Sequence, residues 1–235
     1  MAGAIVINNQ ATFATSGPYV TLPSGLFGSY TAVSVEAWVT TGVNNGWARI
    51  FQYGASATIY SNSLAVNLCS GSCTSGNFLI SWLDSAWSYH IGTTGVGFNS
   101  QTNLHLVMTV SAGDYARLYI NGTLAGFTPS TVNPLPPATA FYLGKSFVST
   151  DSGLIGSVNE FRIWGGALSA TDIAARYSQG PGAGSINLDL SHIFFSSDIC
   201  FLVSFVAKLS DGLCEAGQYY SSTGSCACAP AGLFK

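Results

Sequence analysis

Residues 117–125 read Arg-Leu-Tyr-Ile-Asn-Gly-Thr-Leu-Ala and carry the clearest structural signal in the chain. Apolar and polar side chains alternate before Asn121-Gly122, and a second short run follows it. Alternation with a period of two is typical of a strand with one buried face. Asn-Gly supplies the two positive φ angles of a type I′ turn. The stretch therefore predicts a β-hairpin.

The same period-two pattern recurs along the first 165 residues, between Gly, Asn, Ser and Pro positions. It is clearest over residues 33–40 and 104–110. Asn45-Gly46 predicts a second tight turn of the same kind. Many short strands without helices between them predict an all-β fold, a two-sheet antiparallel jelly-roll sandwich.

One short helix is expected near the end of the sandwich. Ser169 can cap its N-terminus together with Asp172, and Gly180-Pro181 stops it. The composition changes after this point, so we divide the chain into a sandwich over 1–181, a linker and apolar connecting segment over 182–213, and a small disulfide-rich segment, an incomplete cysteine-rich module, over 214–235.

The chain has 235 residues, of which only 7% are charged, and its net charge is −3. A typical soluble domain carries roughly 25% charged residues. No basic run is present, which argues against a nucleic-acid partner or an anionic membrane surface. No apolar run reaches the roughly 18 residues of a transmembrane segment. Residues 1–10 do not have the pattern of a signal peptide, so we expect a removed signal or a piece of a longer chain.

The six cysteines match no common zinc spacing, and the three histidines lie far from them in sequence. An oxidised framework and an extracellular location are the better interpretation. We expect Cys69 to pair with Cys73 across Ser-Gly-Ser, at the tip of a hairpin. Three connectivities stay open for the tail, with Cys214–Cys226 favoured, among Cys200, Cys214, Cys226 and Cys228. The sequon at Asn121 predicts an N-glycan if the source is a eukaryote; the alternative is that Asn121 is present only for its turn propensity.

Several stretches occur in an order that resembles laminin-G-like, concanavalin-A-like jelly-roll domains, over residues 5–181. They are Ser34-Val-Glu-Ala-Trp-Val39, Trp47-Ala-Arg-Ile-Phe51, Leu104-His-Leu-Val107, Leu118-Tyr-Ile-Asn-Gly122, Leu143-Gly-Lys-Ser146, Gly156-Ser-Val-Asn-Glu-Phe-Arg-Ile-Trp164 and Ala167-Leu-Ser169. Many relatives have Asp where this chain has Asn159, so no role of that side chain is carried over. The tail from Cys214 is similar to the cysteine-rich repeats of growth-factor and ephrin receptors.

Catalysis is not expected. Concanavalin-A-like glycoside hydrolases need two carboxylates across the scissile bond. The chain has three glutamates, none followed by Asp two residues later, which leaves Glu36 and Glu160 as the candidate pair. An internal ion pair between Glu160 and Arg162 is the simpler interpretation. His105 lies inside an alternating strand and is expected to be structural.

Two groups of residues could form ligand sites or could have only structural roles. Trp82, Trp87, Tyr89 and His90 lie close together in sequence and could bind a glycan, or could pack in the core. The resemblance implies a calcium site, for which Asp84 and Asp151 are the candidates, although Asp in such loops is commonly a turn residue. No other cofactor is expected.

The low charge and the apolar residues 193–207 suggest assembly. As a strand, this segment has two apolar faces, and its own sandwich covers one; folding back as a helix is the alternative. The contact residues would be Phe195, Phe201, Val203 and Phe205. We therefore predict a non-catalytic extracellular module that binds copies of itself or neighbouring modules. A lectin-like glycan binder is the alternative, and a glycoside hydrolase the third.

Overall fold

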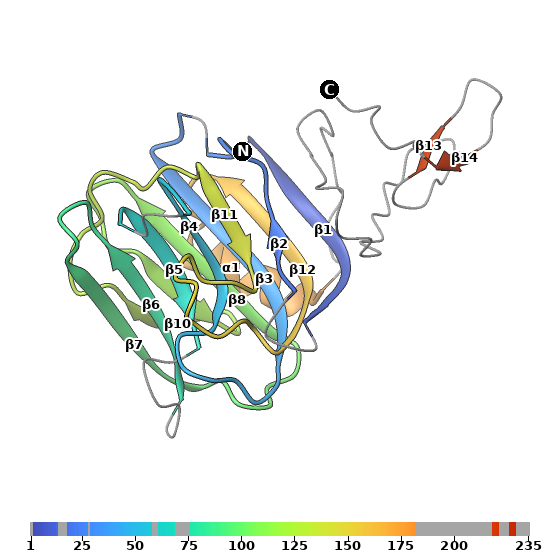
Figure 1. The fold of residues 1–235 in the computed structure, drawn as a ribbon, viewed down its shortest axis with the longest axis horizontal. Helices are drawn as coiled ribbons and strands as arrows, with labels where there is room; N and C mark the ends of the chain where they lie inside the picture. The colour runs from blue at the N-terminus through green and yellow to red at the C-terminus, as the bar shows by residue number, and fades with distance from the viewer. Residues whose placement is uncertain are drawn as a thin grey trace.

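The computed structural model describes residues 2–13, 18–27, 29–57, 61–68, 76–181, 218–220 and 226–228. Two six-stranded antiparallel sheets face each other, as the sequence predicts (Figure 1). The first, sheet A, has the order β1-β12-β3-β8-β9-β10. Its strands are β1 (Ala2–Phe13), β12 (Gly156–Gly165), β3 (Ala32–Thr41), β8 (Leu104–Ser111), β9 (Arg117–Ile120) and β10 (Thr123–Phe127).

The second sheet, sheet B, has the order β2-β11-β4-β5-β6-β7. Its strands are β2 (Val20–Thr21), β11 (Ala140–Leu143), β4 (Arg49–Gly54), β5 (Ser63–Asn67), β6 (Asn77–Leu83) and β7 (Tyr89–Gly97). The chain repeatedly crosses from one sheet to the other, so strands that are neighbours in sequence often belong to different sheets. Side chains distant in sequence are thereby brought together at the ends of the strands.

The hydrophobic core lies between the two sheets. Alternate residues of β3 and β8 point inward, which is what their period-two pattern predicts. They meet a set of aromatic side chains from sheet B and β12, whose rings pack edge-on or tilted: Phe51, Tyr53, Phe141 and Phe161. This core is built from the side chains of short strands.

The predicted hairpin at Asn121-Gly122 is confirmed. Ile120 pairs with Thr123, and the two turn residues have φ angles of 51° and 79°. The second turn prediction is wrong, because Asn45-Gly46 joins β3 of sheet A to β4 of sheet B. The Asn-Gly dipeptide favours a tight turn, but the strands on either side of it do not pair with each other.

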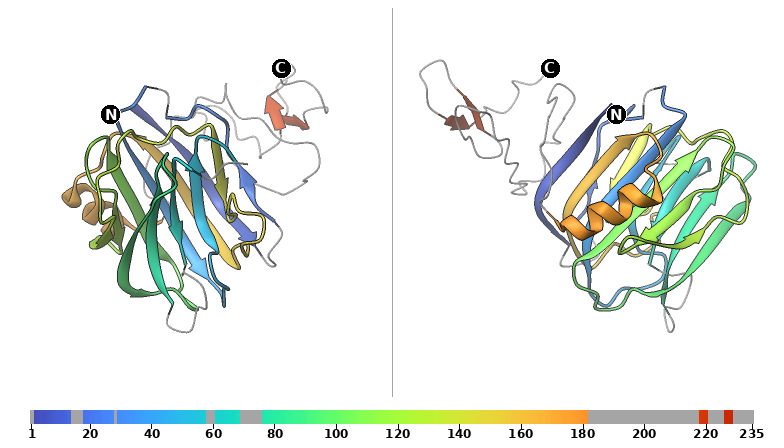
Figure 2. Two further views of the ribbon diagram at one scale, coloured as in Figure 1. Left: turned by 60° about the vertical axis from the view of Figure 1, so that its left-hand side comes forward. Right: turned by 180° about the vertical axis from the view of Figure 1, so that it is seen from behind.

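The predicted helix is α1 (Ala170–Gln179). Ser169 accepts a hydrogen bond from the Asp172 N–H at 3.1 Å, and Gly180 ends the helix with φ 77°. Figure 2 shows α1 lying across the outer face of sheet A. The helix buries Ile173, which packs with Leu168 against Val107 and Tyr119 of the sheet. The helix thus covers part of the outer face of sheet A.

Two predictions about the cysteines fall largely outside the described residues. β5 and β6 form the expected hairpin, but Cys69 and Cys73 at its tip are not described, so their disulfide stays a prediction. In the tail, β13 (Gln218–Tyr220) pairs antiparallel with β14 (Cys226–Cys228).

The expected assembly segment 193–207 also lies outside the described part of the chain. No helix in that part is long and apolar enough to cross a membrane.

Candidate functional site

The turn between β6 and β7 is organised by one carboxylate. Asp84 Oδ1 accepts hydrogen bonds from the backbone N–H groups of Ala86 and Ser88, each at 2.8 Å. Its Oδ2 lies 3.0 Å from His90 Nε2. The His90 hydrogen bond, followed by the Ser88 N–H, holds the pKa of Asp84 below its usual value. The turn therefore has a defined shape and an ionised carboxylate at neutral pH.

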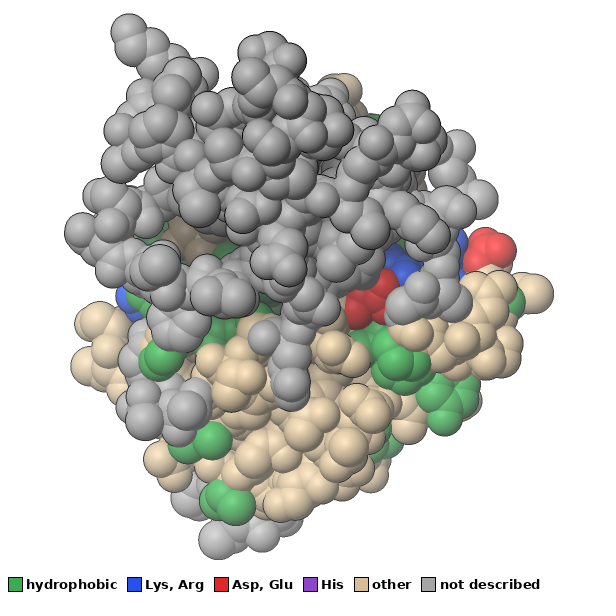
Figure 3. Space-filling model, turned by 90° about the vertical axis from the view of Figure 1, so that its right-hand side faces the viewer, with side chains coloured by type: hydrophobic (Ala, Val, Ile, Leu, Met, Phe, Trp, Pro, Cys, Tyr) green, Lys and Arg blue, Asp and Glu red, His purple; other side chains and the backbone are tan. Residues whose placement is uncertain are grey.

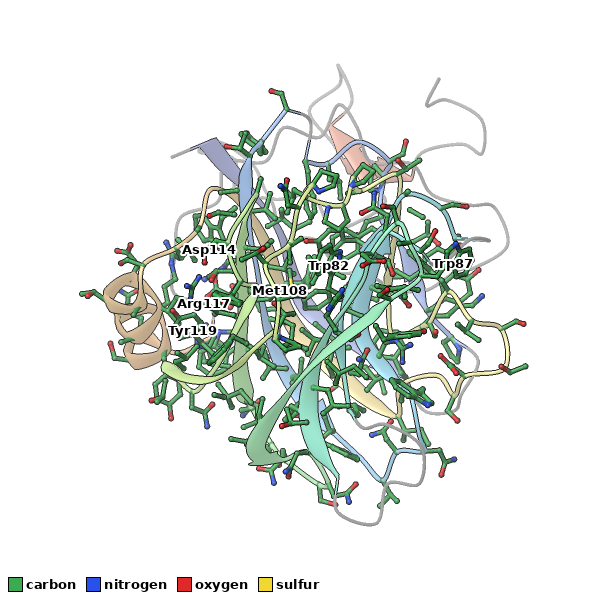
Figure 4. The ribbon with its side chains drawn as sticks, turned by 90° about the vertical axis from the view of Figure 1, so that its left-hand side faces the viewer. Trp82, Trp87, Met108, Asp114, Arg117 and Tyr119 are labelled. Carbon is green, nitrogen blue, oxygen red and sulfur yellow. The ribbon has the colours of Figure 1, made fainter. Side chains whose placement is uncertain are left out.

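This turn presents aromatic side chains to solvent. Trp87 is 52% exposed and Tyr89 is 49% exposed. Trp82, only 5% exposed, belongs to the core and stacks on His90 with ring centroids 4.7 Å apart. Figure 4 shows Trp82 within the sandwich and Trp87 at its margin. Of the four residues predicted to bind a glycan, Trp87 and Tyr89 are about half exposed, whereas Trp82 is buried and His90 bonds to Asp84.

A third aromatic side chain adjoins this pair. Trp47 follows β3 in the connection to β4, and its ring centroid lies 6.3 Å from that of Tyr89. We call Trp47, Trp87 and Tyr89 the aromatic rim. Sequence reasoning missed Trp47, because residues 47 and 89 meet only through the order of strands in sheet B.

Arg49 and Asp151 lie beneath the rim. The Arg49 guanidinium is centred 5.4 Å from the Trp47 ring and lies 3.2 Å from the Asp151 carboxylate, which also accepts a 2.7 Å hydrogen bond from Ser146. Arg49 also donates to the backbone carbonyl of Trp47. Burial lowers the pKa of Arg49, with the Asp151 charge acting in the opposite direction. The ion pair fixes the position of Trp47.

Both tryptophans of the rim adopt left-handed backbone conformations. The φ angle is 62° at Trp47 and 66° at Trp87. Such values are uncommon for any residue except glycine and are outliers for a bulky one. A strained residue costs on the order of 1–3 kcal/mol and tends to occur at functional sites. The two positive φ angles therefore mark this part of the molecule as a candidate functional site.

The candidate catalytic carboxylates occupy a different place. Glu36 of β3 and Glu160 of β12 both bind Arg162, so the predicted Glu160–Arg162 ion pair is confirmed. His105 Nε2 lies 3.0 Å from Glu36 Oε1, and the Trp164 indole N–H donates to Glu36 Oε2 at 2.9 Å. Glu36 is 1% exposed.

The environment of Glu36 keeps it charged despite its burial. Burial favours the neutral acid, but the His105 hydrogen bond, the Arg162 charge and the Trp164 N–H outweigh it and lower the pKa of Glu36. Arg176 of α1 lies 3.9 Å from the same carboxylate. The helix thus contributes Arg176 to a buried ionic cluster in which Glu36 is the shared partner of His105, Arg162 and Arg176. Glu160, like Glu36, is buried.

Comparison with known proteins supports the sandwich assignment. A family model described as the concanavalin A-like lectin/glucanases superfamily (Laminin_G_3) matches residues 14–174. The chain belongs to this family. No curated protein sequence matches it significantly.

Solved structures similar to this laminin-G-like domain have low sequence identity and show the fold alone. Domain 4 of AbnA, an extracellular GH43 arabinanase from Geobacillus stearothermophilus, solved in complex with arabinotriose, is 19% identical with a TM-score of 0.54; the match covers 73% of this chain and 86% of that one. The receptor-binding domain of botulinum neurotoxin D is 16% identical (TM-score 0.55, covering 74% and 47%). The NanB sialidase of Streptococcus pneumoniae is 14% identical (TM-score 0.55, covering 71% and 27%).

The two candidate calcium ligands of the laminin-G-like domain already have partners. Asp84 accepts from its own turn, and Asp151 from Arg49 and Ser146. Within the described residues, no group of three or more His, Cys, Asp or Glu side chains is arranged to hold a metal ion. Asp84 thus shapes its own turn and Asp151 pairs with a buried arginine, while calcium binding by either of them stays a prediction.

Two further sequence positions find a defined place. Asn159 lies at an irregularity in the pairing of β12 with β3. Asn121 Oδ1 accepts a hydrogen bond from the His105 backbone N–H at 3.1 Å. The adjoining Gly122 packs against α1, where a Cβ would lie 3.2 Å from Tyr177 and 3.3 Å from Ala174. The turn therefore packs on the helix, and its glycosylation stays a prediction.

Proposed function

We propose that this domain is a non-catalytic extracellular recognition module that binds glycans at the aromatic rim. The observation that carries the proposal is the rim itself, in which Trp87 and Tyr89 are about half exposed beside Trp47. Flat apolar sugar faces stack on aromatic rings, and a few polar groups around them set orientation.

The internal contacts of Glu36 and Glu160 support a binding role over a catalytic one. Glycoside hydrolysis needs two carboxyl groups that reach opposite sides of one glycosidic bond. Glu36 and Glu160 instead share one guanidinium under α1. The complex of the AbnA domain with arabinotriose shows that a domain of this fold can be studied with an oligosaccharide ligand, and it makes arabinotriose a suitable first probe.

A glycan array probed with the complete chain tests the proposal. We expect binding to at least one oligosaccharide class, and a loss of at least about tenfold in affinity for Trp87→Ala and for Tyr89→Ala, since exposed aromatic contacts dominate such sites. Tyr30→Ala is the matched control: Tyr30 is also an exposed aromatic residue, but it precedes β3 whereas Trp47 follows it, so the two lie at opposite ends of that strand.

Two kinds of result would contradict the proposed function. If no glycan binds, or if the rim variants bind as well as the Tyr30 variant, the rim is not a glycan site. Release of new reducing ends from a bound oligosaccharide would show catalysis and contradict the non-catalytic part of the proposal.

A further inference from the structure

The four described arginines each have a carboxylate partner within the domain. Arg49 pairs with Asp151 at 3.2 Å, and Arg117 pairs with both carboxylate oxygens of Asp114, at 2.8 and 3.1 Å. The mutual hydrogen bond and attraction raise the pKa of Arg117 and lower that of Asp114. An external anion would have to displace an internal carboxylate from either guanidinium.

The remaining cations of the described part are held in other ways. Arg162 binds Glu36 and Glu160, and Arg176 lies 3.9 Å from Glu36 with its guanidinium centred 3.9 Å from the Trp164 ring. The Lys145 ammonium lies 3.8 Å from the centre of the Tyr19 ring and 5.5 Å from that of Tyr142. The lysine is therefore engaged by aromatic faces, in the geometry of a cation–π contact.

The rim has a carboxylate at its turn and an already paired arginine beneath it. Asp84 is two positions before Ala86 in the turn that carries Trp87, and it is ionised at neutral pH because its pKa is lowered. An acidic sugar stacked on Trp87 or Tyr89 would be close to this negative charge, while Arg49 beneath the rim is already paired with Asp151. In Figure 3, which shows the side of the molecule opposite to that in Figure 4, charged side chains occur at only a few places of the described part.

We infer that the aromatic rim selects neutral glycans and discriminates against sialylated, uronic-acid or sulfated ones. The inference rests on the proposed function and adds the ligand class to it. Stacking on Trp47, Trp87 and Tyr89 supplies the affinity, and hydrogen bonds from hydroxyl groups to the surrounding polar side chains supply orientation. The Asp84 carboxylate supplies discrimination through repulsion, which is a common source of specificity.

The test uses matched probes that differ only in charge. Lactose and 3′-sialyllactose, with further neutral and sulfated pairs on one array, are titrated against the complete chain, and arabinotriose serves as an additional neutral probe. We expect the neutral member of each bound pair to bind at least about tenfold more tightly. We also expect its affinity to change by less than about twofold between 50 and 500 mM NaCl, because no ion pair forms with the ligand.

Asp84→Asn isolates the discriminating charge. Asparagine keeps the Oδ1 acceptor for the Ala86 and Ser88 N–H groups but removes the negative charge. We expect the preference for neutral ligands to narrow by about fivefold or more in this variant, while neutral binding is retained. An unchanged ratio would show that the Asp84 charge does not discriminate.

The outcomes separate the inference from the proposed function. Preferential binding of acidic glycans that Trp87→Ala abolishes would overturn the inference and leave the rim as a glycan site. Binding that is insensitive to Trp87→Ala, or an array with no bound glycan, would overturn the proposed function itself. A steep fall of neutral-ligand affinity with salt would also contradict the inference.

Discussion

At the scale of single residues, Trp87 combines an unfavourable backbone with an exposed side chain. A left-handed conformation costs an L-residue roughly 1–2 kcal/mol relative to the right-handed one. The exposed ring recovers little of this by burial, since the Trp87 side chain is half in solvent. A strained and exposed indole is explained by binding better than by stability.

Two substitutions at Trp87 should separate strain from binding. Glycine adopts φ 66° without steric cost, whereas alanine retains the cost of its Cβ. We expect Trp87→Gly to be more stable than Trp87→Ala by about 1 kcal/mol, and both to lose glycan binding. Urea unfolding monitored by the fluorescence of the remaining tryptophans measures the difference. Equal stabilities would show that the positive φ relaxes when the indole is removed.

At the scale of elements, α1 is attached to sheet A by a small apolar contact and a polar cluster. Ile173 is its fully buried side chain, while Arg176 reaches Glu36 and Tyr177 stacks on Trp38 at a centroid distance of 6.1 Å. Such a short helix depends on its cap, because an isolated helix of this length is marginal in water.

Removing the Ser169 cap should measurably lower the free energy of unfolding. Ser169→Ala deletes the hydrogen bond from the Asp172 N–H and the 2.7 Å bond to the Asp172 carboxylate. We expect a loss of about 1 kcal/mol in the free energy of unfolding. Ser178→Ala is the control, because its hydroxyl bonds only the Ala175 carbonyl in the last turn. Similar losses for both variants would argue against a capping role.

The edges of the two sheets come together where β7 of sheet B passes β10 of sheet A. A Cβ on Gly92 would overlap the carbonyl group of Phe127, and one on Gly126 would lie 2.9 Å from the Thr93 carbonyl oxygen. Gly95, in the same strand, has open space around it. The close approach of these backbones shields the edge of each strand, which would otherwise be free to pair with another chain.

Alanine at Gly92 and at Gly95 should have different consequences. Gly92→Ala must push β10 away from β7, because the clashing atoms are backbone, and we expect a loss of about 2 kcal/mol or more. Gly95→Ala should change stability by less than about 0.5 kcal/mol. Thermal unfolding of the pair tests the contact. A Gly92 variant as stable as the Gly95 variant would mean that the two edges are further apart.

At the scale of the whole molecule, the buried ionic cluster links stability to pH. The pKa of Glu36 in the folded domain is lower than the ordinary value of 4.5. The folded state therefore binds fewer protons than the unfolded state in this range, and the contribution of Glu36 is fully present above pH 4.5. It is lost as pH falls through the folded-state pKa, when protonation leaves Arg162 and Arg176 without their shared partner.

Glu36→Gln should remove most of this pH dependence. We expect the variant to be less stable than the wild-type protein by about 3–5 kcal/mol at pH 7, because a buried ion-pair network loses one member. The difference should shrink between pH 5 and pH 3, as the wild-type carboxyl group becomes neutral. Denaturant unfolding at several pH values measures it, and a difference that stays constant across this range would contradict the lowered pKa of Glu36. Asp172→Asn, at an exposed carboxylate of α1, is a control.

Much of the fold and part of the site could be predicted from the sequence, because these features depend on neighbouring residues. The Asn121-Gly122 hairpin, the alternation in β3 and β8, and the Ser169 cap are local: turn chemistry, side-chain period and capping act within a few residues. The internal pairing of Arg162 with Glu160 is of the same kind, since residues two apart on a strand share one face. Exposed and core aromatic residues within 82–90 could not be told apart, because burial depends on the opposite sheet.

By itself, then, the sequence determined the strands, their turns, the single helix and the low charge of this protein. Only the tertiary structure decided that Asn45-Gly46 connects the two sheets, that Glu36 and Glu160 are buried with Arg162, and that the Trp47 ring lies beside that of Tyr89. The physical reason is that each of these depends on the order in which strands distant in sequence are placed in the two sheets. That order is set by the packing of two complete sheets around one core, and no window of sequence contains both partners of such a contact.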